Sequence, residues 1–338
     1  MLSGVRLLEH SKRFPLLDDR LFEASGYDVV FRRGSMRLRL YSAWETPAKA
    51  RVVIFPSLIN RPYILDLGRG KSLIQNFQRN GIEVALFDWG IPGESEVDLG
   101  LQSLLSDRIR PALNALNALS PLSTHAPETV LGHCLGGNLA LYHLLEQSRR
   151  SRKPSREQRL ILLTTPIDFD NNSILNTWFR TPTWNPDAFA RSFNHIPWPV
   201  LQASFLMLKP SATPLKWVDF AKRAKSRDFR ESFFQMELWS NDNVSLPSGL
   251  FRDLLIPLYR DNDLLARADT FGSLTVKTLA LIATDDHIVS LDSAEAVRDI
   301  LPSAEMIHAK GGHIGAVLSK RTRESIWPKL NEFILNDT

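Results

Sequence analysis

The only cysteine of the chain, Cys134, lies in the segment ETVLGHCLGGNLALYHLL, residues 128–145. Residues 132–136 read G-H-C-L-G, the cysteine form of the G-x-S-x-G motif, which places a nucleophile on a tight turn between a strand and a helix. The N-terminus of the following helix would favour a thiolate. The alternative is a small buried side chain whose neighbouring glycines allow close packing.

A thiol nucleophile needs a base, and the base needs an acid that orients it. Two later segments offer these groups in the order acid and then histidine, which is the chain order associated with this motif. The first is DDHIVS, with Asp285 and Asp286, and the second is GGHIG, with His313. We expect Asp286 to be the acid and His313 the base, and Asp285 is the alternative acid.

Other histidines compete with His313 for the role of base. His133 adjoins the nucleophile, but the turn should point it away from Cys134, and His287 follows the expected acid. We expect surface or packing positions for His10, His125, His143, His195 and His308.

An acyl-transfer site also needs two backbone N–H groups that bind the developing oxyanion. One should belong to Leu135, directly after the nucleophile. The other should come from the loop PSLIN after the first apolar run, from Leu58 or Ile59.

The elements that must position these groups are visible as short apolar runs without alternation, separated by segments of helix length. Such runs are typical of parallel strands that are covered on both faces. The pattern predicts an α/β fold with a doubly wound, mostly parallel sheet, and residues 27–41 predict a preceding hairpin that turns at Gly34. The runs are residues 51–55, 82–89, 128–132, 159–165, 278–284 and 304–309.

One interval is far longer than an ordinary connection between a helix and a strand. Residues 166–272 separate two core strands and are rich in Trp and Phe, which predicts a helical cap with its own small core, some of whose aromatic side chains line a substrate channel. We therefore divide the chain into an N-terminal segment (1–46), a core (47–165 and 273–338) and the cap (166–272).

Composition excludes several classes of protein. A single cysteine in 338 residues excludes an intrachain disulfide and a multi-cysteine zinc site, and we expect no metal and no cofactor. Neither a signal peptide nor an apolar run long enough for a membrane span is present, so we expect a cytoplasmic protein. The net charge is only +4, and the basic run 149–159 lacks interleaved aromatics, so we interpret it as a solvated loop and expect no binding of nucleic acid.

The choice of cysteine over serine narrows the chemistry. A free thiol is only slightly ionised at neutral pH, but it is intrinsically far more nucleophilic than a hydroxyl group. Thiols also exchange readily with thioesters, the reacting groups of acyl-CoA molecules. Cys134 therefore favours acyl transfer from a thioester over ordinary ester hydrolysis.

From about Tyr27 to its C-terminus the chain resembles the polyhydroxyalkanoate synthases, in particular the short catalytic subunits that work with a second subunit. They belong to the α/β-hydrolase superfamily. Beyond the motif around Cys134, the resemblance is carried by residues 56–67, 72–92, 164–170, 203–210, 236–239, 285–289 and 311–315. The chain departs from the family at Lys277 and Ser290, where the family usually has proline, and after residue 92.

The resemblance implies an α/β-hydrolase fold with an inserted helical cap and a Cys-His-Asp enzyme. Such an enzyme polymerises (R)-3-hydroxyacyl-CoA into polyester and releases CoA. Cys134 would hold the growing chain, His313 would activate the thiol or the incoming hydroxyl, and Asp286 would orient His313 or assist the hydroxyl directly. The implied partners are a second synthase subunit, further copies of the chain and the surface of polyester granules.

Two other functions remain open on the same residues. A thioesterase or an intracellular polyester depolymerase would use the same triad, but it would deliver water to the acyl-enzyme, whereas a synthase must exclude water. A granule-associated protein without catalytic activity is the third reading, although all three residue types of the triad are present.

Overall fold

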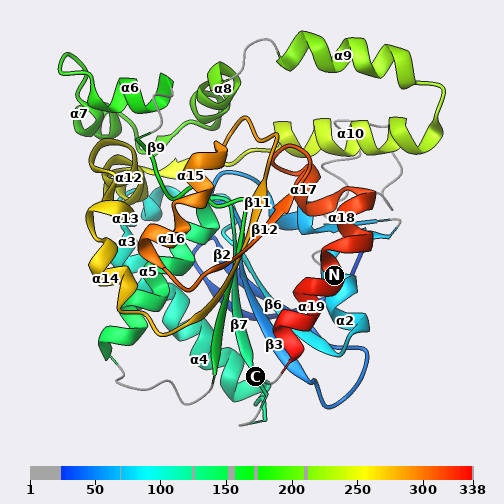
Figure 1. The fold of residues 1–338 in the computed structure, drawn as a ribbon. Coiled ribbons are helices and arrows are strands. Elements are labelled where there is room, and N and C mark those ends of the chain that lie inside the picture. Colours follow the sequence, from blue (N-terminus) through cyan, green and yellow to red (C-terminus); the bar gives the residue numbers. More distant parts are fainter. Residues whose placement is uncertain are drawn as a thin grey trace.

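The computed structural model describes residues 24–68, 70–123, 126–150, 157–170, 174–208 and 212–336, without the side chains of residues 174 and 212–215. His10, His125, residues 1–23 of the N-terminal segment and residues 151–156 of the basic run lie outside the described residues. An eight-stranded sheet occupies the centre, in the order β1-β2-β6-β3-β7-β8-β11-β12 (Figure 1).

Six of the strands run parallel to one another, and β1 and β2 add an antiparallel hairpin at one edge. The six parallel strands coincide with the six apolar runs to within one or two residues at each end. The predicted doubly wound sheet is therefore confirmed. The strands are β1 Asp28–Arg33, β2 Met36–Tyr41, β3 Ala50–Phe55, β6 Ile82–Asp88, β7 Glu128–His133, β8 Gln158–Leu163, β11 Lys277–Ala283 and β12 Glu305–Ala309.

Apolar cores cover both faces of the sheet, which explains why the strands do not alternate between apolar and polar residues. Successive residues of β3 enter opposite cores: Val53 and Phe55 pack on one face, and Val52 and Ile54 pack on the other. Figure 1 shows α4, α5 and α16 on the first side of the sheet and α2 and α19 on the second. The bounds are α2 Leu73–Arg79, α4 Arg110–Leu119, α5 Leu135–Arg150, α16 Val297–Ile300 and α19 Trp327–Leu335.

The helix before β7 contains an irregularity next to Pro111. After α3 (Leu101–Ser103), residues Leu104–Ile109 form π-helical turns, and the amide of Arg110 bonds back to the carbonyl of Leu105. A proline inside a helix lacks the N–H donor and crowds the preceding turn, so a local widening at this point has a steric cause. The helix accommodates Pro111 by a widened stretch before α4.

Between β8 and β11 the chain forms a series of helices that lies toward one end of the sheet (Figure 1). Within α9 and α10, five aromatic rings pack against one another, with neighbouring centroids between 4.5 and 6.3 Å apart: Trp217, Phe220, Phe229, Phe233 and Phe234. The elements are α6 Ile174–Arg180, α7 Pro186–Arg191, β9 His195–Ile196, α8 Trp198–Leu208, α9 Ala212–Arg223, α10 Arg227–Asn241, β10 Leu246–Pro247, α11 Ser248–Leu250, π-helical η5 Phe251–Leu255, α12 Ile256–Asp261, α13 Asp263–Ala266 and α14 Ala268–Gly272.

The shorter elements complete the described chain. β4 and β5 pair with each other outside the main sheet, and α15 and α17 follow the strands β11 and β12 that carry the acid and histidine segments. Their bounds are η2 Pro62–Leu65, β4 Asp66–Leu67, β5 Lys71–Ser72, η3 Glu94–Glu96, α15 Leu291–Glu295, α17 Gly315–Leu318 and α18 Lys320–Ser325. None of the helices in the described ranges is long and apolar enough to cross a membrane.

One residue of the basic run differs from the solvated loop that its composition predicted. Arg159 lies in β8 and is fully buried. Its guanidinium donates to the carbonyls of Phe333 and Ile334 at 2.7 and 2.9 Å and pairs with Glu157 at 2.8 Å. The prediction was wrong here because charge along the sequence does not reveal that this side chain caps the last carbonyls of α19.

Candidate active site

Cys134 occupies a left-handed turn between β7 and α5, at a φ of 55°. Its amide donates to the carbonyl of Leu163 on the neighbouring strand at 3.0 Å, and its carbonyl accepts from Gly137 at 2.8 Å. Positive φ is unfavourable for a side chain such as cysteine, and such strain concentrates at functional sites. The chain therefore forms the strand–turn–helix context that the motif requires.

The flanking glycines are required by contacts that a β-carbon would block. At Gly136 a β-carbon would lie 2.0 Å from the carbonyl oxygen of Phe55, and at Gly132 it would lie 2.3 Å from the Cα of Gly137. Both obstacles are backbone atoms and cannot rotate away. The glycine pattern in the sequence thus reflects close approach of β3, β7 and the start of α5.

Asp286 and His313 meet although they are far apart in the sequence. Oδ2 of Asp286 lies 2.7 Å from Nδ1 of His313, and both side chains are almost fully buried. The second carboxylate oxygen accepts hydrogen bonds from the amides of Ile288 and Val289, at 2.8 and 3.2 Å. These two bonds fix the orientation of the carboxylate toward the imidazole.

Asp285, the alternative acid, faces elsewhere. Its carboxylate accepts from the amide of Gly311 at 3.0 Å, and the residue is exposed. It holds the loop that carries His313 but is not hydrogen-bonded to the imidazole. Of the two carboxylates, the structure brings only Asp286 to His313.

The charge state of His313 follows from its neighbours. Burial lowers the pKa of the imidazole, but the negative charge of Cys134, hydrogen bonds with Asp286 and Cys134, and the charge of Asp286 together raise it to about 10. At neutral pH the imidazole is therefore protonated beside Cys134. A cysteine beside an imidazole that a carboxylate orients is an arrangement that can attack a carbonyl carbon.

His133 lies closer to this pair than its sequence position suggested. It is buried, its ring centroid is 5.8 Å from that of His313, and its Nε2 has no hydrogen-bond partner among the described residues. Burial and the positive charge of His313 lower the pKa of His133 to about 3, although the negative charge of Asp286 acts in the opposite direction. His133 thus lies beside His313 as a neutral imidazole.

The other described histidines are outside the site. His143 is buried against Phe55, with ring centroids 5.4 Å apart, and His308 pairs with Glu295 at 2.6 Å. His195 belongs to the two-residue strand β9, and His287 is exposed. These positions agree with the expectation for His143, His195 and His308.

The three residues expected at the oxyanion site are all buried. Leu135 begins α5 directly after Cys134, and Leu58 and Ile59 follow β3 in the adjacent loop. The amide of Ile59 is directed at the hydroxyl of Ser57 at 3.5 Å, and its carbonyl accepts from Val244.

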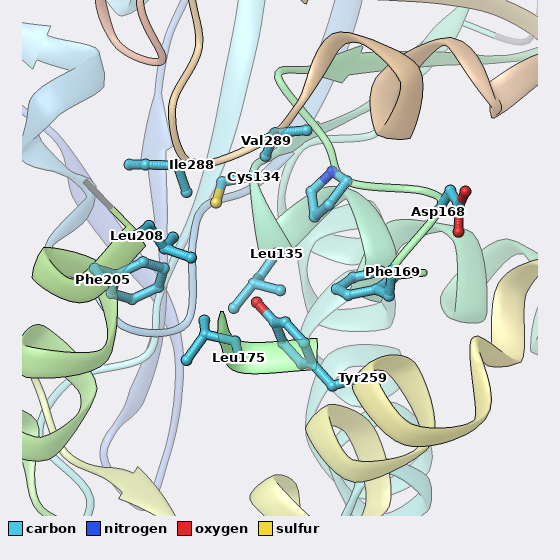
Figure 2. Close-up of a pocket in the computed structure, with 11 residues that line it drawn as sticks. Cys134, Leu135, Asp168, Phe169, Leu175, Phe205, Leu208, Tyr259, Ile288 and Val289 are labelled. Atoms are coloured by element: carbon cyan, nitrogen blue, oxygen red, sulfur yellow. The ribbon is translucent and has the colours of Figure 1, made fainter. Parts of the chain in front are cut away.

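A small pocket opens at Cys134 and is walled largely by the segment between β8 and β11 (Figure 2). Leu175 of α6 and Phe205 and Leu208 of α8 lie opposite the thiol, and Tyr259 of α12 points its hydroxyl into the pocket between Leu135 and Leu175. Burial and the charge of Cys134 raise the pKa of Tyr259. Sequence reasoning missed Tyr259, because no motif or spacing links residue 259 to residue 134.

No cluster of three His, Cys, Asp or Glu side chains in the described part of the chain is arranged to hold a metal ion.

The sequence profile of the alpha/beta hydrolase fold matches residues 51–318. The chain belongs to the alpha/beta hydrolase fold family. This membership agrees with the central sheet, the turn that carries Cys134, and the order of Cys134, Asp286 and His313 along the chain.

Among curated proteins, this alpha/beta hydrolase is similar to several that are named poly(3-hydroxyalkanoate) polymerase subunit PhaC. The Haloferax mediterranei protein is 26% identical over 90% of this chain, and the chain spans only 63% of that protein's length. The Allochromatium vinosum protein is 25% identical over 97% of this chain and 95% of its own length. The Synechocystis protein is 28% identical over 91% of this chain and 83% of its own length.

Solved structures share the fold at much lower identity. A carboxyl esterase from Bacillus coagulans superposes with a TM-score of 0.60 at 12% identity, covering 91% of this chain and 97% of its own. A monoacylglycerol lipase from Paleococcus ferrophilus gives a TM-score of 0.53 at 13% identity, covering 89% and 98%. At such identities the likeness is one of fold alone.

Proposed function

We propose that the chain is an acyltransferase that polymerises (R)-3-hydroxyacyl-CoA into polyester and releases CoA, with Cys134, His313 and Asp286 as its catalytic residues. The observation that carries the proposal is that His313 lies 2.7 Å from Asp286 and is hydrogen-bonded to Cys134, the only cysteine of the chain. The names of the similar curated proteins supply the class of substrate.

In the first step, the thiolate of Cys134 attacks the carbonyl carbon of the CoA thioester. A new carbon–sulfur bond forms to Cys134, and the bond to the sulfur of CoA breaks. His313 gives its proton to the departing CoA thiolate and becomes neutral. The acyl group is then held as a thioester on the enzyme.

In the second step, the 3-hydroxyl group of another hydroxyacyl-CoA attacks this acyl-enzyme. Neutral His313 accepts the hydroxyl proton, an ester bond forms, and Cys134 leaves as a thiolate beside the restored imidazolium. Cys134 then attacks the CoA thioester of the lengthened chain, which returns the chain to the enzyme and releases CoA. One cysteine thus suffices for growth by one monomer.

Two amides would bind the negative charge that develops on the carbonyl oxygen. Leu135 supplies the first in this scheme. For the second we favour Leu58, because the amide of Ile59 is directed at Ser57. No cofactor is needed, since the thioester supplies the activated acyl group and His313 handles both proton transfers.

Residues 166–272 would form a cap that excludes water from the acyl-enzyme, and walls contributed by α6 and α8 to the Cys134 pocket support this role. A second synthase subunit belongs to the same proposal, since the similar curated proteins are named subunits. We also propose further copies of the chain, a cytoplasmic location and contact with polyester granules.

The test is incubation of the purified chain with (R)-3-hydroxybutyryl-CoA, alone and with the second subunit of a two-subunit synthase. Chromatography would quantify CoA, free 3-hydroxybutyrate and polymer separately. We expect CoA release with polymer formation, and none of either from a folded Cys134→Ala variant. Release of free acid without polymer, with or without the subunit, would identify a thioesterase instead. Absence of CoA release under all these conditions would support a protein without catalytic activity.

A further inference from the structure

A second, larger cavity lies beside the Cys134 pocket. Its volume is about 390 Å³, and its walls come from α6, α7, α8 and η5. Aromatic and aliphatic side chains dominate these walls, among them Trp184 and Phe251, and the only side-chain hydroxyls among the described residues that line it are those of Thr181 and Ser204. Such a lining can hold an apolar chain but offers little to a charged or hydrogen-bonding ligand.

The cavity is open to solvent on one side, since Trp178 and Val200 in its walls are 39% and 37% exposed. Pockets that bind small molecules have volumes of about 300–1,000 Å³. The cavity falls in this range, although it lies within the inserted segment and away from the triad.

The cavity and the Cys134 pocket share a wall. Leu175 of α6 lines both spaces, so its side chain is the partition between them. Beside it, the ring of Phe179 in the cavity stacks on the ring of Tyr259 in the Cys134 pocket, with centroids 5.1 Å apart. Consecutive residues of α8 divide in the same way: Ser204 lines the cavity and Phe205 lines the pocket.

We propose that this cavity binds the alkyl side chain of the hydroxyacyl group carried by Cys134, and that it selects monomers with medium-length chains over 3-hydroxybutyryl groups. This inference rests on the proposed function for the identity of the acyl group. The thioester carbonyl and the 3-hydroxyl stay beside Cys134 and His313, and the carbons beyond the hydroxyl pass Leu175 into the cavity. A methyl side chain ends before the partition and gains nothing from the cavity.

Equilibrium binding in the Cys134→Ala background tests the site without turnover. Isothermal titration would compare (R)-3-hydroxydecanoyl-CoA with (R)-3-hydroxybutyryl-CoA. We expect the decanoyl thioester to bind at least about tenfold more tightly, because several methylene groups leave water. Added to this background, Ser204→Phe fills the cavity and should abolish the difference, and the matched control Ala203→Phe, at an exposed neighbouring position on α8, should preserve it.

A second variant guards against misfolding of Ser204→Phe. Leu175→Ala removes the partition, and we expect it to raise kcat/KM for the decanoyl thioester at least threefold relative to the butyryl thioester. Equal affinity for the two thioesters in the Cys134→Ala protein, or equal losses for both on Ser204→Phe in a folded protein, would overturn the assignment. The assignment would also be overturned if decanoic acid bound as tightly as (R)-3-hydroxydecanoyl-CoA, because the cavity would then be a site for a free fatty acid.

These results separate the two proposals. If neither thioester is polymerised or cleaved by the wild type but the decanoyl preference and its loss in Ser204→Phe persist, the cavity assignment stands and the proposed function fails. If both thioesters are polymerised at equal kcat/KM and the cavity variants affect them equally, the proposed function stands and the cavity assignment fails.

Discussion

Asp286→Asn should abolish most of the activity by moving the proton of His313 to the wrong ring nitrogen, while the fold stays intact. In the wild type, one carboxylate oxygen accepts from the amides of Ile288 and Val289, and the other bonds to Nδ1 of His313. The two amides require an oxygen at the first position. The NH₂ group of the introduced amide must therefore face His313.

That orientation places the imidazole proton on the wrong nitrogen. An NH₂ group can only donate, so Nδ1 of His313 becomes an acceptor and the proton of the neutral ring moves to Nε2. The imidazole can then no longer accept a proton from a thiol or hydroxyl group at that nitrogen. The substitution also removes a negative charge and a charged hydrogen bond that raise the pKa of His313.

The expected loss follows from the burial of the pair. Removing one partner of a buried charge pair costs about 3–5 kcal/mol, which corresponds to a loss of about 10²- to 10⁴-fold in kcat/KM if the pair acts in the transition state. Because the chain has a single cysteine, alkylation by iodoacetamide reports on Cys134 alone. The alkylation rate at pH 7 should fall as well, and mass spectrometry measures it without any assumption about the substrate.

Asp285→Asn is the matched control, since it makes the same chemical change one residue away in an exposed side chain. The introduced amide keeps an oxygen that can accept from the amide of Gly311, so we expect activity and alkylation rate to stay within about threefold, the range of an exposed substitution of about 0.5 kcal/mol. If Asp285→Asn loses as much as Asp286→Asn, or if Asp286→Asn keeps wild-type alkylation and turnover, the reasoning from the carboxylate geometry is refuted.

Three further predictions use independent observations. Cys134→Ala should lower the pKa of His313 from about 10, because the charge of Cys134 helps to raise it, and an NMR titration measures this change. The raised pKa stabilises the fold fully below the ordinary value of 6.5, and this contribution is lost as the pH rises through about 10. The free energy of unfolding in urea should therefore fall more steeply between pH 7 and 10 in the wild type than in this variant. Arg51→Met should lower the free energy of unfolding in urea by about 3–5 kcal/mol. Arg51 pairs with Glu83 at 2.7 Å in the wild type, and the variant would leave this carboxylate buried without its cation. Adding Glu83→Leu should recover part of the loss. Hydrogen exchange should be faster in α6 and α8 than in β7, because a cap that admits substrate must open more readily than the central sheet, and equal protection of all three would contradict this expectation.

The fold could be predicted from the sequence because each parallel strand can be recognised from its own residues. Runs such as residues 51–55 and 278–284 are apolar on both faces, and each coincides with a strand that is buried on both faces. The proximity of Asp286 and His313 could be predicted because both residues follow the ends of parallel strands, where a sheet of this kind gathers such segments. Glycines around Cys134 added a local signal, since close backbone contacts leave no space for a side chain.

The remaining features depend on contacts between distant segments, which no local pattern encodes. Tyr259 reaches the Cys134 pocket only because α12 packs beside α6, and the wall that Leu175 forms between two cavities is a property of three helices together. Arg159 was misjudged for the same reason, since its hydrogen-bond partners are more than 170 residues away in the chain. Which of Asp285 and Asp286 contacts His313 also required coordinates, because the two residues are chemically identical and adjacent.

The size of the pocket at Cys134 bears on how an acyl-enzyme could survive there. Its volume is about 20 Å³, little more than the space that one water molecule needs. A longer alkyl side chain therefore has room beside Cys134 only if α6 or α8 shifts or if Leu175 moves aside into the larger cavity. The same movement fills with alkyl chain the space that water would otherwise enter. In this scheme the length of the side chain and the exclusion of water are coupled, since a longer chain seals the site more completely and leaves the hydroxyl of the next monomer as the nucleophile that remains.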